Sequence, residues 1–207
     1  MLHFIEGDLA NKADHATLIE AMHRNRADVF GPKGHNWVVH VIGGWEVDEF
    51  DNAEPLYVIS TGDTGKYHGS LRLLPTTGPN MLRDVFPELL VEKDVDGCPL
   101  IGFTIESATI WESSRICVAG VAVANILHEL VLGIGEVCRR AGLTQIVSVF
   151  DPLVLRRLRG IGLKVDIIGT PQRIGGVMCY AGLFDFDNGK MEDFKKRWGL
   201  DHVEFSS

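Results

Sequence analysis

The sequence predicts a single-domain α/β protein whose mixed, mostly antiparallel twisted sheet is flanked by helices on both faces. Three observations lead to this prediction. The chain has 207 residues, a length at which one domain can bury a full hydrophobic core. Short apolar segments with strand character come first, and strands then alternate with helical patterns toward the carboxyl end. No repeat divides the chain, so we expect one domain over residues 1–207, with a polar tail from about residue 187.

The first part of the chain contains four expected strands and one helix. Leu2–Ile5 is a short apolar run typical of a strand. Apolar side chains recur at helical spacing over Ala16–Phe30, and a Gly-Pro pair then ends the helix. A strand is expected at Trp37–Val41, before an acidic loop. Leu56–Thr61 and Tyr67–Leu74 are two further strands, which the turn sequence Gly-Asp-Thr-Gly joins into a hairpin.

The second part of the chain alternates strands with helices. A short, proline-interrupted helical piece is expected at Met81–Leu90. The longest helical pattern covers Val121–Ala141, and Gly142 supplies its stop. The other elements expected here are strands at Ala108–Val118, Gln145–Phe150, Lys164–Gly169 and Val177–Phe184, and helices at Pro152–Leu158 and Met191–Trp198.

Composition excludes several classes of function. A net charge of −8 argues against a nucleic-acid partner, which requires a basic face. No apolar run reaches the roughly 18–20 residues of a membrane span. The segment from Met1 to Asp8 has neither a basic leader nor a small-residue cleavage site, so we expect a cytoplasmic protein. The four cysteines and eight histidines are scattered without metal-ligand spacing, so no metal site is expected.

Charge is distributed unevenly along the chain. Residues 41–65 contain six acidic side chains and no lysine or arginine. Residues 137–165 contain one acid, Asp151, and six bases, which are Arg139, Arg140, Arg156, Arg157, Arg159 and Lys164. A basic surface on an acidic protein indicates an acidic partner recognised at one place. The alternative is that these bases are solvated helix faces balanced by their neighbours.

Charged residues inside expected core elements are the most informative. Six of them fall within or beside such elements, namely Arg26, Asp48, Asp51, Arg72, Glu112 and Arg115. An unpaired buried charge is costly, so these three arginines and three acids are expected to neutralise one another around a cleft. The alternative is an ion-pair network with a structural role only.

The order of these residues resembles that of the acyl-homoserine-lactone synthases, the LuxI-type autoinducer synthases of bacterial quorum sensing. The matching positions are Arg26-x-x-x-Phe30, Trp37, Asp48-x-x-Asp51, Ser70-Leu71-Arg72 and Glu112-Ser113-Ser114-Arg115, together with the stretch from Leu71 to Pro87. The resemblance runs from the amino terminus to about Asp151. It implies an N-acetyltransferase-like α/β/α sandwich.

The resemblance also implies an activity. Such enzymes transfer an acyl group from an acyl-carrier-protein or acyl-CoA thioester to the amine of S-adenosylmethionine (SAM). They then close the lactone and release methylthioadenosine. SAM is therefore the expected co-substrate, and no permanently bound cofactor is expected. The alternatives are an N-acyltransferase for a different amine, or an inactive relative that acts as a binding module.

Catalytic roles are implied for Glu112, Arg115 and Arg72. The amine of SAM has a reference pKa of roughly 7.7–8.0 and must lose a proton before it attacks, so Glu112 is the expected acceptor, through a water molecule. Strand alternation places Glu112 and Arg115 on opposite faces unless a bulge intervenes. By the same resemblance, SAM would be held by Arg26, Phe30, Trp37, Asp48 and Asp51. Trp37 as plain core, and Asp48 with Arg72 as structural partners, are the alternatives.

The acyl chain is expected to lie beside the strand at 146–150. The residues implied for its pocket are Met81, Val147, Ser148 and Val149. Ser148 faces away from Val147 and Val149, and its hydroxyl is a candidate donor to a 3-oxo group. The alternative is that Ser148 binds a neighbouring backbone group.

The six bases of residues 137–165 are expected to dock acyl carrier protein, which is strongly acidic, or to meet the phosphates of coenzyme A.

Two departures from the family pattern stand out. The link from Phe30 to Trp37 is one residue longer and lacks the arginine usual before the tryptophan. The acetyltransferase phosphate loop is not matched after Arg115, which disfavours a plain coenzyme A acetyltransferase.

Overall fold

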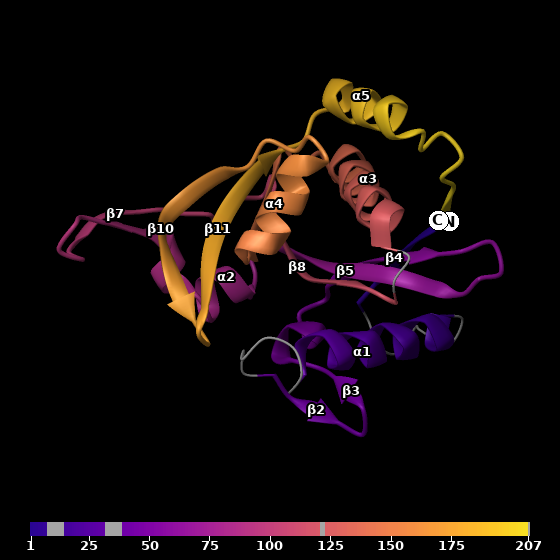
Figure 1. The fold of residues 1–207 in the computed structure, drawn as a ribbon, viewed down its shortest axis with the longest axis horizontal. Helices are drawn as coiled ribbons and strands as arrows, with labels where there is room; N and C mark the ends of the chain where they lie inside the picture. Colours follow the sequence, from indigo (N-terminus) through magenta and orange to yellow (C-terminus); the bar gives the residue numbers. More distant parts are fainter. Residues whose placement is uncertain (8–14, 32–38, 121–122, 207) are drawn as a thin grey trace.

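An eight-stranded sheet crosses the molecule, and all but two of its pairings are antiparallel (Figure 1). The computed structural model describes residues 1–7, 15–31, 39–120 and 123–206. Only the pairs β8–β9 and β1–β12 of this sheet are parallel, so the mixed, mostly antiparallel prediction is confirmed. In spatial order its strands are β10 (Asp166–Ile174), β11 (Val177–Asp185), β9 (Gln145–Phe150), β8 (Ile110–Val118), β5 (Tyr67–Pro75), β4 (Leu56–Thr61), β1 (Leu2–Glu6) and β12 (Phe205–Ser206).

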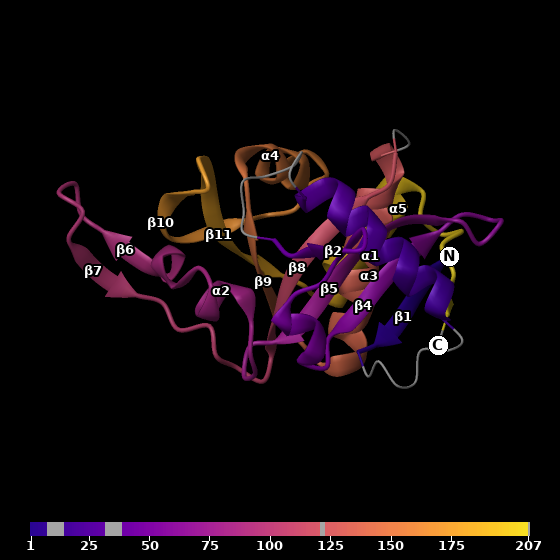
Figure 2. The same cartoon turned by 90° about the horizontal axis from the view of Figure 1, so that it is seen from below.

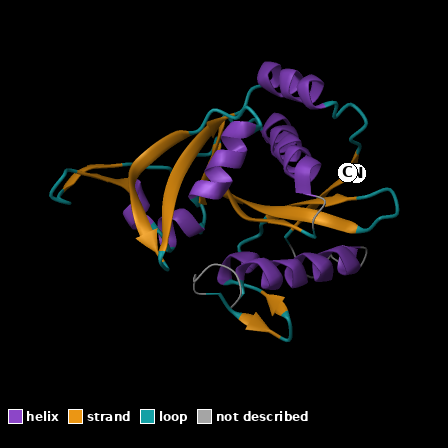
Figure 3. Cartoon of the chain, viewed as in Figure 1, coloured by secondary structure: helices purple, strands orange, loops and turns teal. Residues whose placement is uncertain are grey.

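Helices cover both faces of this sheet (Figure 3). On one side lie α3 (Val123–Ala141), α4 (Pro152–Gly160) and α5 (Asn188–Trp198). On the other side lies α1 (Ala16–Phe30), with the small hairpin of β2 (Val41–Ile42) and β3 (Trp45–Glu46) packed beside it. The short helical turns are η3 (Glu49–Asn52), α2 (Met81–Asp84) and η4 (Pro87–Leu90). No helix among the described residues is both long and apolar enough to cross a membrane.

Two strand predictions need correction. The strand expected at Trp37–Val41 begins only at Val41, and Trp37 lies outside the described residues. The strand expected at Lys164–Gly169 starts at Asp166 and continues to Ile174. Gly169 is not its end but part of a bulge, with a φ of +63°. An added Cβ there would lie 2.1 Å from the carbonyl oxygen of Leu89, so glycine lets η4 pack against β10.

Two other features have no counterpart in the sequence prediction. The hairpin of β6 (Val91–Lys93) and β7 (Pro99–Gly102) projects from the body of the molecule (Figure 2). The expected tail helix is present as α5, but the chain then continues into β12, which pairs in parallel with β1 and brings the two ends of the chain together. Both strand sets are only two to four residues long, too short for a periodic pattern to identify them.

A bulge interrupts β8 at the centre of the sheet. Ser70 pairs with Cys117 and Arg72 with Ser114, so β8 carries one residue more than β5 between these points. Arg115 lies in this bulge with a φ of +53°. The bulge that the sequence analysis left open is therefore present. The parallel pairing of β8 with β9 ends at Ser113 and Ser148, and beyond these residues the two strands part.

Candidate functional site

Six charged side chains form a buried cluster between α1 and the sheet. They come from five elements and comprise Arg26 of α1, Glu46 of β3, Asp48 and Asp51 at η3, Arg72 of β5 and Arg115 of β8. Every one of these side chains is at most 7% exposed. Three guanidinium groups face three carboxylates, so the cluster is neutral overall.

Asp51 is the centre of this charge cluster. Arg26 donates from both Nη atoms to its carboxylate, at 2.8 and 3.0 Å. Arg72 Nη1 donates to Asp51 Oδ1 at 2.9 Å, and the hydroxyl of Tyr57 donates to the same oxygen at 2.8 Å. Burial alone would raise the pKa of Asp51, but Arg26 and Arg72 hold it well below its ordinary range. Asp51 therefore stays ionised at any physiological pH.

The bulge in β8 directs Arg115 into the same cluster. Its Nη2 atom lies 2.8 Å from Glu46 Oε1 and 2.9 Å from Asp48 Oδ2. The guanidinium also stacks over the ring of Phe30, 5.2 Å from its centroid. The structure thus brings Phe30, Asp48 and Arg115 together, as the sequence predicts.

Glu112 lies beside the cluster but does not belong to it. Its carboxyl is buried, and the backbone amide of Leu82 donates to Oε2 at 2.6 Å. The other oxygen, Oε1, has no hydrogen-bond partner among the described residues. Burial raises the pKa of Glu112, against the opposing effects of the Leu82 amide, Arg72 and the Ser114 side chain. A carboxyl with a raised pKa and a free oxygen is suited to accept a proton.

A small cavity adjoins Glu112. It measures about 20 Å³ and is lined by Met81, Phe86, Glu112, Ser114, Arg115 and Val149. This volume is enough for about one water molecule. Glu112 and Arg115 both line this cavity, although they are three residues apart in one strand.

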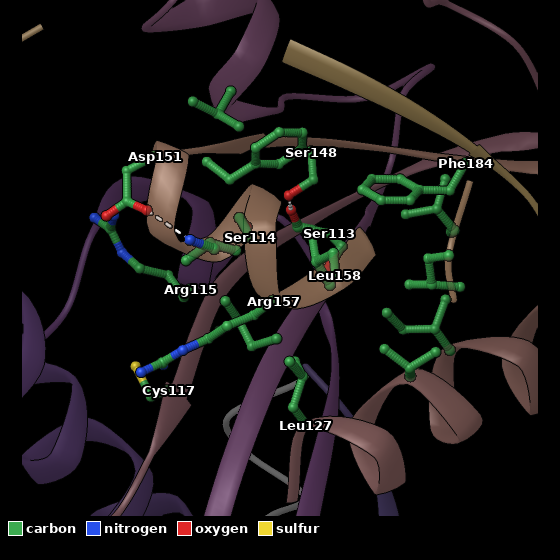
Figure 4. A pocket seen from close by; sticks show the side chains of 18 of the residues that line it. Ser113, Ser114, Arg115, Cys117, Leu127, Ser148, Asp151, Arg157, Leu158 and Phe184 are labelled. Carbon is green, nitrogen blue, oxygen red and sulfur yellow. Dashed lines mark hydrogen bonds between the residues drawn. The ribbon is translucent and has the colours of Figure 1, made fainter. Parts of the chain in front are cut away.

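A much larger pocket opens where β8 and β9 part (Figure 4). Its volume is about 720 Å³, the size of a site for a cofactor-sized ligand. Polar groups of Arg115, Asp151 and Arg157 line one part of it, and apolar side chains of α3, α4 and β11, such as Leu127, Leu158 and Phe184, line the rest. The pocket therefore offers a charged region for an anion and an apolar region for a hydrocarbon chain.

The residues predicted to hold the acyl chain separate between these cavities. Ser148 lines the large pocket, Met81 the small cavity and Val149 both. Val147 lines neither cavity and packs in an apolar cluster with Leu74 and Leu89. The hydroxyl of Ser148 donates to the carbonyl oxygen of Ser113 at 2.7 Å, which is the backbone contact given as the alternative in the sequence analysis.

The structure does not gather the six bases of residues 137–165 on one surface. Arg139 and Arg140 both pair with Glu136 at the end of α3, and Arg140 also stacks over Phe4 of β1. Lys164 pairs with Asp166 at 3.0 Å. The three remaining bases, Arg156, Arg157 and Arg159, are exposed on α4, which packs near β11 toward the opposite edge of the sheet. Of the six, only Arg157 lines the large pocket.

Glu46 is the member of the site that sequence reasoning did not single out. Its carboxylate pairs with Arg26 Nε and with Arg115, and its backbone carbonyl contacts His23 Nδ1 at 2.8 Å. The only signal in the sequence is that a segment rich in acids and free of bases needs partners elsewhere. That signal does not separate Glu46 from its neighbours Glu49 and Glu54.

The depressed pKa of Asp51 predicts how stability depends on acid. A carboxyl with a folded pKa below its unfolded value of about 3.9 contributes stability that is present above that value and is lost as the pH falls. We expect the free energy of unfolding, measured in urea, to decrease steadily below about pH 4. Unchanged values from pH 5 to pH 3 would contradict the ionised state of Asp51 in the cluster.

Comparisons with known proteins identify the family. A family model described as "Autoinducer synthase" matches residues 10–194. An acyl-homoserine-lactone synthase of Agrobacterium fabrum is 34% identical over 184 residues, which cover 85% of this chain and 82% of the relative. An isovaleryl-homoserine lactone synthase of Bradyrhizobium diazoefficiens is 26% identical over 98% of this chain and 88% of its own length.

Solved structures give the same answer for the fold. A CoA-dependent acyl-homoserine lactone synthase, BjaI, solved with SAM and isopentyl-CoA, matches with a TM-score of 0.81 at 26% identity. The match covers 100% of this chain and 93% of that one. An N-acetyltransferase from Lactobacillus plantarum matches at 15% identity with a TM-score of 0.55, covering 90% of this chain and 99% of that one, which shows the acetyltransferase-like fold alone. The chain belongs to the autoinducer synthase family, a family of acyltransferases that includes the acyl-homoserine-lactone synthases.

Proposed function

We propose that this protein makes an N-acyl-homoserine lactone by moving an acyl group from a thioester to the amine of SAM and then closing the lactone ring. The observation that carries the proposal is that Ser114, Arg115 and Val149 line both cavities. The cavity beside Glu112 therefore adjoins the large pocket, so a proton acceptor lies next to a space that suits a thioester. These substrates are made in the cytoplasm, where we place the enzyme.

The first chemical step is N-acylation. Glu112 takes a proton from the SAM ammonium group, through a water molecule in the small cavity. The freed amine attacks the thioester carbonyl, the new C–N bond forms, and the C–S bond breaks. The nitrogen loses a second proton as the amide forms, and the leaving thiolate takes up one proton to become the free thiol. The raised pKa of Glu112 lies closer to that of the amine than an ordinary carboxyl would, which favours the transfer.

The second step is ring closure. The carboxylate of the same methionine unit attacks its own γ carbon, and the C–S bond of the sulfonium breaks to release neutral methylthioadenosine. The sulfonium is already a good leaving group, so the protein has to supply position rather than acid or base catalysis. We assign this positioning to the charge cluster. Phe30, Asp48 and Arg115 form the wall that faces SAM, with Trp37, which lies outside the described residues, assigned beside them. Arg26, Asp51 and Arg72 support that wall.

Mass spectrometry of a reaction containing the purified protein, SAM and a series of acyl thioesters tests the proposal. Equal amounts of an acyl-homoserine lactone and methylthioadenosine are expected. An acylated amine without a lactone would favour the alternative enzyme, an N-acyltransferase for another acceptor. No product from any donor, with folded protein that still binds SAM, would favour the inactive binding module.

Two kinds of thioester could deliver an acyl chain to the large pocket, acyl-CoA and acylated acyl carrier protein. We propose that acyl-CoA is the preferred donor. The solved relative named as CoA-dependent aligns with the whole of this chain. Arg157 lines the pocket, and Arg156 and Arg159 flank it on α4, so these bases can meet the phosphates of coenzyme A. The same arginines also suit the acidic surface of a carrier protein. The ratio of kcat/KM for acyl-CoA and acyl carrier protein with the same acyl chain decides between the two donors.

Arg157 gives a direct prediction for donor binding. We expect Arg157→Ala to raise the KM for the thioester about five- to tenfold, the equivalent of one hydrogen bond, with kcat little changed. Arg139→Ala is the matched control, because Arg139 is paired with Glu136 away from the pocket. An equal effect of the two substitutions would mean that Arg157 contributes only general surface charge.

Ser148 gives a prediction for chain selectivity. Its single hydroxyl proton is donated to the Ser113 carbonyl, so it is not available to a 3-oxo group, which can only accept. We expect Ser148→Ala to leave the ratio of rates for 3-oxo and unsubstituted thioesters of equal length unchanged. A drop in that ratio would show that Ser148 leaves Ser113 to bind the substrate, as the family resemblance implies.

A further inference from the structure

The backbone amide of Leu82 orients the carboxyl group of Glu112, with a further contribution from the Ser114 side chain. Leu82 N donates to Glu112 Oε2 at 2.6 Å, and Leu82 is the second residue of the short turn α2. The other oxygen, Oε1, has no hydrogen-bond partner in the described part of the chain and is the one left to accept a proton. Whatever fixes the position of this turn therefore also determines which oxygen of Glu112 is free.

Asn80 holds the turn from inside. Its side chain is completely buried, and both ends of the amide are used. Oδ1 accepts from Arg83 N at 3.0 Å, and Nδ2 donates to Gly78 O at 3.0 Å. The backbone amide of Asn80 donates to Asp84 Oδ2 at 3.0 Å. One residue thus ties the start of α2 both to its own last residue and to the loop before it.

The preceding loop is in turn fixed to the strand that carries Glu112. Thr76 is completely buried, and its hydroxyl lies 2.7 Å from the carbonyl oxygen of Ile110, at the start of β8. Ser107 N donates to the same hydroxyl at 3.1 Å. The Leu82 amide and the Glu112 carboxylate are therefore held on one framework, with Asn80 between them.

We propose that Asn80 is a positioning residue for the reaction, which aims the Leu82 amide at Glu112 and so keeps Oε1 free for the proton. The inference rests on the proposed role of Glu112 as the proton acceptor. Asn80 is absent from the lining of both cavities, so it acts through Leu82 and not on the substrate.

The consequence of losing Asn80 follows from the charge on Glu112. A hydrogen bond to a carboxylate favours its ionised form, so misplacing the Leu82 amide raises the pKa of Glu112 beyond the rise that burial already causes. A hydrogen bond to a charged group corresponds to a further rise of about one to two pH units. At neutral pH a larger fraction of the enzyme then carries a protonated, inactive base.

The experiment measures the titration of Glu112 directly in the full chain. Infrared spectra over a pH series record its protonated carboxyl band, which is identified by its absence in Glu112→Gln. We expect the midpoint to move up by about one to two units in Asn80→Ala and by less in Asn80→Ser, which keeps a capping oxygen but loses the Nδ2 donor. The acidic limb of the pH profile of kcat should shift together with the Glu112 midpoint. The KM for SAM should stay unchanged.

The matched control is Asp187→Ala. Asp187 caps α5 by accepting from Lys190 N at 2.8 Å, far along the chain from the site, so this substitution also removes a cap. We expect it to leave the Glu112 midpoint unchanged. A wild-type midpoint in every Asn80 variant that folds would overturn the proposal. Normal turnover in Glu112→Gln would instead reject the role of Glu112, so the two failures are distinguishable.

Discussion

Replacing Glu112 with glutamine is expected to lower turnover by about 10²–10⁴-fold, the range for lost general-base catalysis. The amide fills the same space but has no lone pair basic enough to take the proton from SAM. Binding of SAM should be little affected, because Glu112 lies outside the charge cluster to which we assign SAM binding. Steady-state kinetics give kcat, and calorimetric titration gives the SAM affinity of the variant.

The same substitution is expected to leave the protein at least as stable at neutral pH. Burial raises the folded pKa of Glu112, so its contribution to stability is full below the unfolded pKa of about 4.3 and is lost as the pH rises through the folded pKa. Glutamine stays neutral and avoids this loss. A thermal melt at pH 7.5 should therefore show an equal or higher Tm. A lower Tm with unchanged kcat would make Glu112 a structural residue only.

Replacing Arg72 with alanine is expected to lower the free energy of unfolding by about 3–5 kcal/mol, the cost of leaving a buried charge without its partner. Arg72 is 0% exposed and binds both Asp48 and Asp51. Its removal leaves three carboxylates with two guanidinium groups. Activity should disappear as well, because Arg72 supports the wall that we assign to SAM. Urea unfolding and turnover are the two measurements.

Tyr57→Phe is the control that separates architecture from catalysis. It removes one hydrogen bond to Asp51 but leaves both arginines in place. We expect the free energy of unfolding to fall by about 1.5 kcal/mol, the low end for a hydrogen bond to a charged group, with turnover largely kept.

If Arg72→Ala abolished activity at an unchanged free energy of unfolding, the charge cluster would contribute nothing to stability and Arg72 would act on the substrate.

Elements with a long periodic pattern could be predicted from the sequence. The helix over Ala16–Phe30 is found with those bounds, and the strands around the Gly-Asp-Thr-Gly turn pair as the expected hairpin. The bulge at Arg115 could be named only as a condition, because two residues three apart in a regular strand face opposite sides, and the structure shows that the strand carries the extra residue. Buried charge is too costly to occur without partners, so Arg26, Asp51 and Arg72 could be identified as one group.

The sequence by itself determined the fold class and the family and supplied the candidate residues for the chemistry, because these depend on local periodicity and on the types of residue in order. The tertiary structure alone decided their partners. It brought Glu46 into the charge cluster, gave the Ser148 proton to Ser113, and divided the bases of α3 from those of α4. Each of these depends on which surfaces distant segments present to one another when the sheet is assembled, and no local pattern in the chain encodes that.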